Sequence, residues 1–167
     1  IGAMNTGREK AILNDMYTAF IQGGVSIVAA SRTAANFPVS ARVSGCRVSP
    51  DRHYVDLFVS KRSGAPLLAV LMEGAPLAVC FTQPSTHQCI QLKSSFSVVQ
   101  ELDPKAEKIL PRYVNSLAAD VAGFGYSEAF VRALLGTTPD DLVTIRFKPE
   151  AAFQQTPGPL AGTSLNT

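Results

Sequence analysis

The sequence predicts a mainly β fold, an antiparallel sheet or barrel with helices at its periphery. Segments rich in β-branched residues outnumber the segments with helical periodicity, and several follow one another through tight turns. A Rossmann-type fold is excluded because it needs regular strand–helix alternation and a glycine-rich first turn. One domain is expected over residues 1–167, a length typical of a single folded unit. The opening residues 1–3, before Met4, are interpreted as an expression scar.

Composition supports a globular protein and excludes several function classes. Hydrophobic residues make up 46% of the chain, charged residues 17%, and the formal net charge is +2. That balance lacks the dense basic face that nucleic-acid binding needs, and no apolar run reaches the length of a membrane span. No secretory signal segment opens the chain, so we expect a cytoplasmic protein.

The cysteines and histidines predict neither a disulfide framework nor a metal site. Three cysteines are present, at positions 46, 80 and 89, and no two of them form a close pair in sequence. His53 and His87 are the only histidines, and no metal-ligand spacing links them to the cysteines. We therefore expect the cysteines to be small buried hydrophobic residues in strands.

The first part of the chain predicts a helix and three strands. Apolar residues recur at helical spacing over Thr6–Gln22, and Gly23 with Gly24 ends this helix. Gly45, within the second strand, predicts a β-bulge or a close backbone approach. The strands, separated by turns at 32–37 and 49–51, are expected at Val25–Ser31, Val39–Val48 and His53–Ser60.

The middle of the chain predicts a short helix and two more strands. Leucines at helical spacing indicate a helix over Ser63–Glu73, with Ser63 as its N-cap and Gly74 beyond its end. The run Leu77–Thr82 predicts a strand. A longer strand is expected over Gln88–Gln100, with a kink at residues 93–95.

The last third predicts a helical pair, one strand and a tail. Asp103 and Pro104 suit a helix start, and this helix is expected to reach about Ala122, with a bend at Pro111. Ser127 is expected to open a shorter helix that ends at Gly136. A final strand over Asp141–Lys148 precedes a tail rich in proline and glycine over Phe153–Thr167.

Two cationic segments are candidates for an anion site. Arg42 and Ser44 share one parity of their strand, and a bulge at Gly45 would let Arg47 approach the same groove as Arg42. Two guanidiniums there would suit a phosphate, although solvated surface arginines are the simpler interpretation. The run Lys61-Arg62-Ser63 precedes a helix N-terminus, where free backbone N–H groups favour anions; a plain charged loop is the alternative.

No catalytic motif is recognisable. The polar turn at residues 83–87 ends in His87, which is an acid or base candidate without an assignable carboxylate partner. A structural or solvent-facing histidine is the simpler interpretation. No nucleophile–base–acid order, phosphate-binding loop or carboxylate pair is present.

Taken together, the segments resemble the pyridoxamine 5′-phosphate oxidase-like family of FMN-binding split barrels. The resemblance runs from the first strand to the last and depends on the order of the segments. It is carried by Ala41-Arg42-Val43-Ser44-Gly45-Cys46-Arg47, by Leu57–Ser60 leading to Ser63, by Pro76–Phe81, by Gln88–Lys93, and by a tail at 153–159 similar to that of short, poorly characterised members.

The resemblance implies an antiparallel split β-barrel that works as a homodimer with FMN at the subunit interface. It implies a flavin-dependent oxidoreductase of unknown substrate. A non-enzymatic flavin, deazaflavin or haem binder on the same fold is the alternative. The implied cofactor contacts are Arg42, Val43, Ser44, Arg47, Val59, Ser60 and either Gln88 or Gln91, to which the loop residues Lys61, Arg62 and Ser63 are added.

The sequence also departs from the oxidase proper. Ser63 is followed by Gly64 and Ala65, where the oxidase has an Arg-Lys pair that holds the FMN phosphate. Lys61 and Arg62 are candidates to replace that pair from the other side of Ser63. The oxidase's substrate-binding segment has no counterpart between Lys105 and Gly136, and the chain contains no tryptophan. Pyridoxine phosphate oxidation is therefore not expected.

Overall fold

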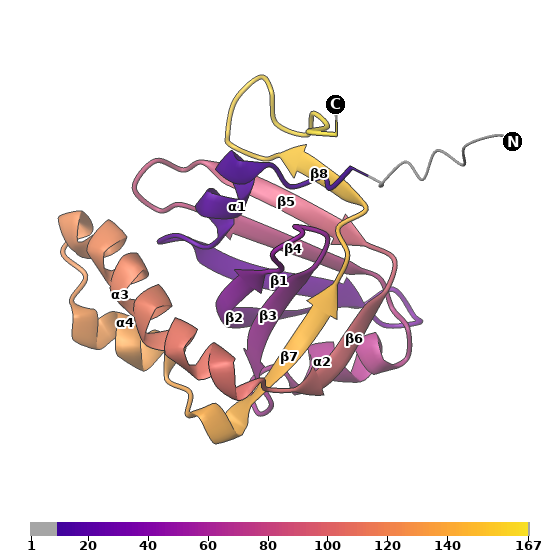
Figure 1. The fold of residues 1–167 in the computed structure, drawn as a ribbon, viewed down its shortest axis with the longest axis horizontal. Coiled ribbons are helices and arrows are strands. Elements are labelled where there is room, and N and C mark those ends of the chain that lie inside the picture. The colour runs from indigo at the N-terminus through magenta and orange to yellow at the C-terminus, as the bar shows by residue number, and fades with distance from the viewer. Residues whose placement is uncertain (1–9, 167) are drawn as a thin grey trace, which may run out of the picture.

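The computed structural model describes residues 10–166, and its framework is one eight-stranded sheet (Figure 1). The strand order is β6-β7-β3-β2-β1-β4-β5-β8, and every pair of neighbours is antiparallel. The strands are β1 (Ser26–Arg32), β2 (Pro38–Val48), β3 (Val55–Ser60), β4 (Leu77–Thr82), β5 (Cys89–Ser94), β6 (Ser97–Glu101), β7 (Leu142–Phe147) and β8 (Ala151–Gln154).

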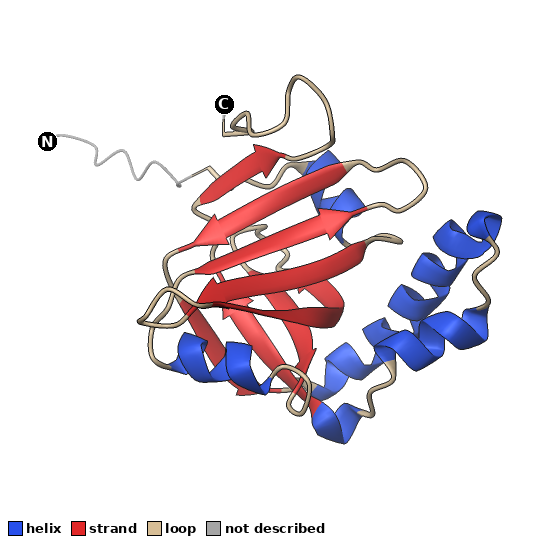
Figure 2. Cartoon of the chain, turned by 180° about the vertical axis from the view of Figure 1, so that it is seen from behind, coloured by secondary structure: helices blue, strands red, loops and turns tan. Residues whose placement is uncertain are grey.

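In the described part of the chain, four α-helices and three short 3₁₀ turns lie at the margins of this sheet (Figures 1 and 2). The helices are α1 (Asp15–Ile21), α2 (Ala65–Met72), α3 (Ile109–Val121) and α4 (Glu128–Leu135), and the 3₁₀ turns are η1 (Pro104–Lys108), η2 (Ala122–Phe124) and η3 (Pro139–Asp141). The predicted mainly antiparallel β fold with peripheral helices is confirmed. None of the helices among the described residues is long and apolar enough to span a membrane.

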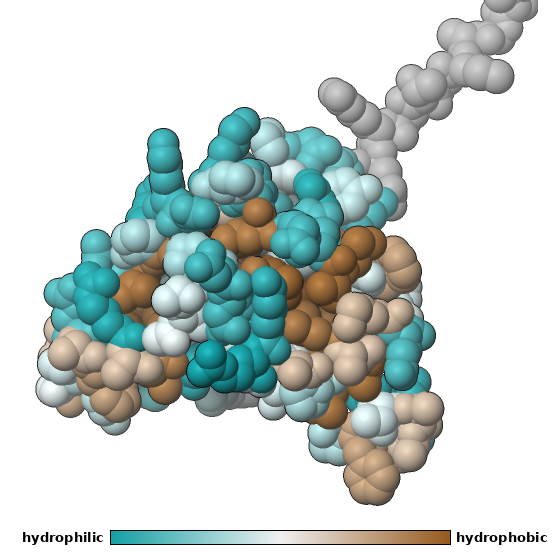
Figure 3. Space-filling model, turned by 90° about the horizontal axis from the view of Figure 1, so that it is seen from below, coloured by the Kyte–Doolittle hydropathy of each residue, from teal (hydrophilic) through white to brown (hydrophobic). Residues whose placement is uncertain are grey.

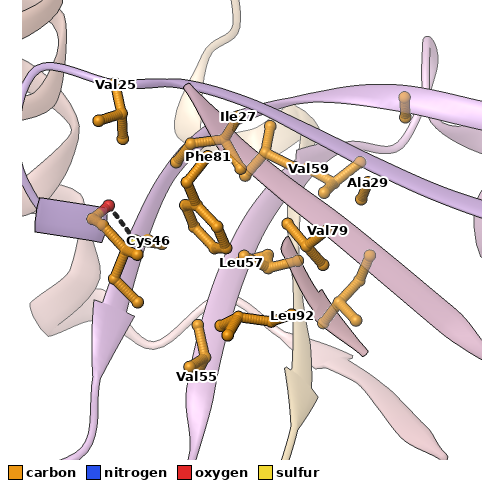
Figure 4. Close-up of a cluster of buried hydrophobic side chains, with 14 of the residues drawn as sticks. Val25, Ile27, Ala29, Cys46, Val55, Leu57, Val59, Val79, Phe81 and Leu92 are labelled. Atoms are coloured by element: carbon orange, nitrogen blue, oxygen red, sulfur yellow. Dashed lines mark hydrogen bonds between the residues drawn. The ribbon is translucent and has the colours of Figure 1, made fainter. Parts of the chain in front are cut away.

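The sheet curls around a single hydrophobic core (Figure 4). Strands from both ends of the sheet order supply side chains to one buried cluster, including Leu57, Val79, Phe81 and Leu92. The two edge strands, β6 and β8, do not pair with each other, so the barrel is open along one seam. This geometry is a split barrel, and its core alternates with an outer face along every strand.

A bulge in β2 keeps its apolar residues directed at the core. Val43 pairs with Val59 and Cys46 pairs with Leu57, so Ser44 and Gly45 together oppose a single residue of β3. Gly45 has a φ of 143°, a conformation that residues with a side chain rarely adopt. The predicted bulge is confirmed.

Several element boundaries differ from the sequence predictions. The first helix begins at Asp15, where the Asn14 side chain caps the backbone N–H of Tyr17; the expected start at Thr6 lies outside the described residues, as do residues 1–3. Gly64 rather than Ser63 is the N-cap of α2. Pro111 lies in the first turn of α3, where proline is tolerated without a bend.

The predicted strand over residues 88–100 is two strands, and the expected tail contains a strand of its own. The turn between β5 and β6 is closed by Ser94, whose hydroxyl donates to the carbonyl of Phe96. β8 begins before the expected tail and pairs with β5. The chain then folds back, with a bridge between Phe153 and Ser164, so the tail is part of the sheet edge.

Candidate functional site

A polar pocket of about 210 Å³ brings together five of the predicted site residues. It lies where β2, β3 and the loop before α2 meet the C-terminal end of α4. These five residues are Arg42, Ser44, Ser60, Arg62 and Ser63. The opposite wall is formed by residues 133–137 and by Asp141.

Asp141 fixes the loop that forms one side of the pocket. Its carboxylate accepts hydrogen bonds from the Ser60 hydroxyl at 2.5 Å and from the backbone N–H of Arg62 at 3.2 Å. The N–H groups of Ser63 and Gly64 are bound by the hydroxyl and the carbonyl of Ser60. The backbone N–H groups of Arg62, Ser63 and Gly64 are therefore already hydrogen-bonded within the chain and are not available to an anion.

The available positive charge of the pocket comes from two arginine side chains. Arg42 is exposed, and its guanidinium donates to the Ser26 hydroxyl at 2.9 Å. Among residues 10–166, the Arg62 guanidinium has no hydrogen-bond or ion-pair partner. Against these two cations stands the single carboxylate of Asp141, so the pocket has a net charge that favours an anion.

Arg42 begins a row of outward-facing side chains that crosses five strands. The strand registers pair Arg42 with Val28, Val28 with Cys80, Cys80 with Gln91, and Gln91 with Phe153. Val28 is 37% exposed, and Cys80, Gln91 and Phe153 are half-buried. Figure 2 shows this face with the helices at its margins. Small and apolar side chains form the middle of the row, with the guanidinium of Arg42 at one end and the amide of Gln91 toward the other.

Arg47 lies outside this pocket, contrary to the hypothesis that the two arginines share a groove. Its guanidinium is bound to Asp56 at 2.9 Å and to Asp103 at 3.0 Å. The Asp56 side chain is only 5% exposed, and Arg146 lies 3.6 Å from its other oxygen. These carboxylates raise the pKa of Arg47 further, against the effect of its partial burial. Arg47 is thus held as a structural ion pair.

The remaining predicted site residues occupy separate places. Val43 and Val59 pair with each other, and their side chains are fully buried in the core, so only their backbone can face a ligand. The Lys61 ammonium donates to the carbonyl of Asp140 and does not line the pocket. Gln88 lies in the connection before β5, whereas Gln91 lies in the row described above. Of the two glutamine candidates, the geometry therefore favours Gln91.

The histidines do not contribute to this site. His87 is exposed in the turn between β4 and β5, and His53 lies in the turn before β3; neither lines the pocket. Among the described residues, no group of three or more histidine, cysteine or acidic side chains is placed to hold a metal ion.

Sequence reasoning missed two parts of the pocket. Asp141 follows Asp140 just before a strand, and only the fold shows that its carboxylate reaches the loop at residues 60–62. The wall formed by Gly136 and Thr137 was also missed, because these residues come from the helical pair and meet β2 only in three dimensions. The only local signal for Asp141 was its position as the first residue of a predicted strand.

Comparison with known proteins supports the fold. No protein-family model matches the chain, and no curated protein matches it by sequence. Among solved structures, a protein from Lactobacillus delbrueckii named provisionally as a pyridoxamine 5′-phosphate oxidase superposes with a TM-score of 0.53 at 13% identity, covering 84% of this chain and 93% of that one.

Two further solved structures have the same architecture. HupZ of Group A Streptococcus gives a TM-score of 0.54 at 11% identity, covering 90% of this chain and 99% of that one. An F420 reductase gives 0.54 at 12% identity, covering 84% and 98%. The fold is therefore that of pyridoxamine 5′-phosphate oxidase-like split barrels, as the sequence resemblance implied. Identities this low establish the fold alone.

Proposed function

We propose that the chain binds a phosphorylated flavin-type cofactor, FMN or a deazaflavin, along the row from Arg42 to Gln91. The observation that carries the proposal is the continuity between the two-arginine pocket and this row, since Arg42 belongs to both. In this arrangement Arg42 and Arg62 hold the phosphate, and the Ser63 hydroxyl adds a hydrogen bond. The ring lies over Val28 and Cys80.

The dimensions of the row fit an elongated ligand of this kind. Arg42 and Gln91 are separated by three strand spacings of about 4.8 Å, which gives about 14 Å between their backbones. The side chains between them are short enough to leave a planar ring room above the sheet. The Gln91 amide oxygen accepts from Gln155 at 3.2 Å, which orients the amide toward this face. An oriented amide suits the polar edge of a flavin ring.

The cofactor would supply the redox chemistry, and the chain would bind it and exclude competing reactions. This division of labour fits a sequence without a recognisable catalytic motif. We therefore propose a flavin-dependent oxidoreductase, with a non-enzymatic flavin carrier on the same site as the alternative. The similarity in fold to an F420 reductase supports including a deazaflavin among the candidates.

We further propose that the protein is a homodimer and that the partner subunit covers the cofactor face. Charged residues make up only 17% of the chain, and apolar side chains reach the surface in several places, as Figure 3 shows for one face. A ring lying on the open row would be solvated on one side unless a second copy covered it. Size-exclusion chromatography with light scattering tests this; a monomer at working concentration would argue against an interface site. The cytoplasmic location stays a prediction.

Titration of FMN into the purified chain tests the site directly. We expect saturable quenching of flavin fluorescence, and Arg42→Ala and Arg62→Ala should each weaken binding by about tenfold or more, because each removes a charge-assisted contact of about 1.5–3 kcal/mol. The matched control is Arg112→Ala, an exposed arginine on α3, which should leave the affinity unchanged. Equal affinity of all three variants would remove both arginines from the site.

The visible absorption spectrum of the purified protein separates the cofactor classes. Flavin bands support the proposal, and a deazaflavin spectrum selects that cofactor within it. Haem bands would contradict the proposal. They are not expected, because neither histidine lies in the pocket, where it could serve as an axial ligand.

A further inference from the structure

Two of the three cysteines face the same side of neighbouring strands. Cys80 on β4 is paired with Gln91 on β5, and Thr82 is paired with Cys89, so the two cysteines occupy diagonal positions on one face of the ladder. That face is the outer one, because Val79 and Phe81 alternate with Cys80 and point into the core. Burial raises the pKa of the Cys80 thiol, and the neighbouring Cys89 adds to this effect.

Each sulfur accepts a hydrogen bond from a neighbouring side chain. The Thr82 hydroxyl donates to the Cys89 sulfur at 3.2 Å, and the Gln91 amide donates to the Cys80 sulfur at 3.7 Å. The Gln91 donor offsets part of the effect of burial, but the pKa of Cys80 stays raised, so the reactive thiolate form of Cys80 forms under alkaline conditions. Cys80 is half-buried and Cys89 is buried, so an incoming reagent meets Cys80 first.

Cys46 provides an internal contrast. Its side chain is buried in the core, where its thiol donates to the carbonyl of Ile21 at 3.0 Å (Figure 4). Burial and the nearby Asp56 carboxylate raise its pKa well above the usual range of a thiol. Because its sulfur is enclosed in the core, out of reach of a reagent, Cys46 is expected to stay unreactive in the folded protein.

We propose that Cys80 and Cys89 form a redox-active dithiol on the open sheet face, which closes reversibly to an intramolecular disulfide. With a low-molecular-weight disulfide as oxidant, the Cys80 thiolate attacks one sulfur of the oxidant and releases one thiol. Cys89 then attacks Cys80, forms the protein disulfide and releases the second thiol. The two electrons pass to the oxidant, and the two protons from the cysteines end on the released thiols.

The geometry favours a disulfide that is easily reduced again. Diagonal residues on neighbouring strands have Cα atoms about 7–8 Å apart. Unstrained disulfides need about 4.4–6.8 Å. The bond would therefore draw β4 and β5 together locally, and strained disulfides have more oxidising potentials. This is typical of a switch or a catalytic pair rather than of a structural cross-link.

Oxidation of the full-length chain with excess oxidised glutathione tests the proposal. We expect the count of free thiols to fall from three to one and the intact mass to fall by two hydrogens, with full reversal by a reducing agent. No lysine or arginine lies between Ser63 and Ile90, so trypsin leaves both cysteines in one peptide. Chymotrypsin cuts after Phe81 and should give two peptides joined until reduction.

Single variants assign the two roles. Cys89→Ser should leave Cys80 as a stable glutathione adduct, because no second thiol resolves it. Cys80→Ser should leave Cys89 reduced, and Cys46→Ser should still lose two thiols, which keeps the test valid if one variant folds poorly. Circular dichroism of each variant checks folding before oxidation.

Retention of all three free thiols in the wild-type chain would overturn the proposal, as would a persistent glutathione adduct or a disulfide between two chains. The test is made without flavin, so its outcome is independent of the proposed cofactor site. Cys80 also belongs to the row over which the ring is proposed to lie. If both proposals hold, the bound ring lies over Cys80 and shields the dithiol from the oxidant.

Discussion

Arg42 and Arg47 lie on the same strand and the same face of the sheet, yet they have different surroundings. Ala41, Val43 and Cys46 point into the core, so both arginines point outward. Arg47 lies where two carboxylates bind it beside η1, and Arg42 lies on the open face with a single hydroxyl partner. The elements that pack over a strand therefore decide whether an outward-facing arginine is held in an ion pair or is available to a ligand.

The covered half of the outer face is closed by α3. Tyr113 of this helix packs beside Gly45, and its hydroxyl donates to the carbonyl of Val25 at 2.7 Å. Phe58 lies beneath and is fully buried. By contrast, the half formed by β1, β4, β5 and β8 has its helices at the margins (Figure 2), and this half carries the proposed ligand row.

Arginine truncation gives the largest expected difference between the two halves. Arg47→Ala should lower the free energy of unfolding by about 2–3 kcal/mol, because it leaves the buried Asp56 carboxylate with only the more distant Arg146. Arg42→Ala should change it by less than about 0.5 kcal/mol. Urea denaturation of both variants measures the two losses of stability. Equal losses would contradict the assignment of a structural role to Arg47 alone.

The bulge that separates the two arginines gives the next effect. Gly45→Ala should destabilise the fold by about 1–3 kcal/mol, because a φ of 143° is strained for any residue with a side chain. Gly123→Ala is the matched control, since an added Cβ there meets nothing within 4 Å. Its expected effect is within about 0.5 kcal/mol. Similar thermal midpoints for the two variants would show that the bulge conformation is not required.

The smallest expected effect concerns Asp120, which joins the two halves. This α3 residue accepts hydrogen bonds from Ser85 and Gln83 of the turn before β5. Burial tends to raise the pKa of Asp120, but these hydrogen bonds outweigh it and hold the pKa below its usual value. The resulting stabilisation is present above the unfolded pKa and is lost as the pH falls through the folded pKa.

Asp120→Asn should therefore cost less than about 1 kcal/mol near neutral pH, because the carboxylate is partly solvated. The difference from wild type should shrink under acidic conditions, where Asp120 becomes protonated. Denaturation of both proteins across this pH range measures it. If the difference in free energy of unfolding stays constant with pH, ionisation of Asp120 does not contribute to the loss of stability in acid.

Local patterns predicted most of the strands, and long-range packing decided what they missed. Leu77–Thr82 was located to the residue because its largely apolar run is bounded by Pro76 and by the turn that contains Pro84. β8 was missed because its short segment is recognisable only through pairing with β5. The pocket was predicted in part, since Arg42 and Arg62 are visible as cations in sequence. The engagement of Arg47 by Asp103, 56 residues away, and the role of Asp141 needed the fold.

A crystal structure of the protein grown with FMN tests the central claim most directly. The account predicts the phosphate within hydrogen-bond distance of Arg42 and Arg62, and the ring over Val28 and Cys80 with its polar edge toward Gln91. FMN bound on the α3-covered half, or an empty row at saturating FMN, would contradict it.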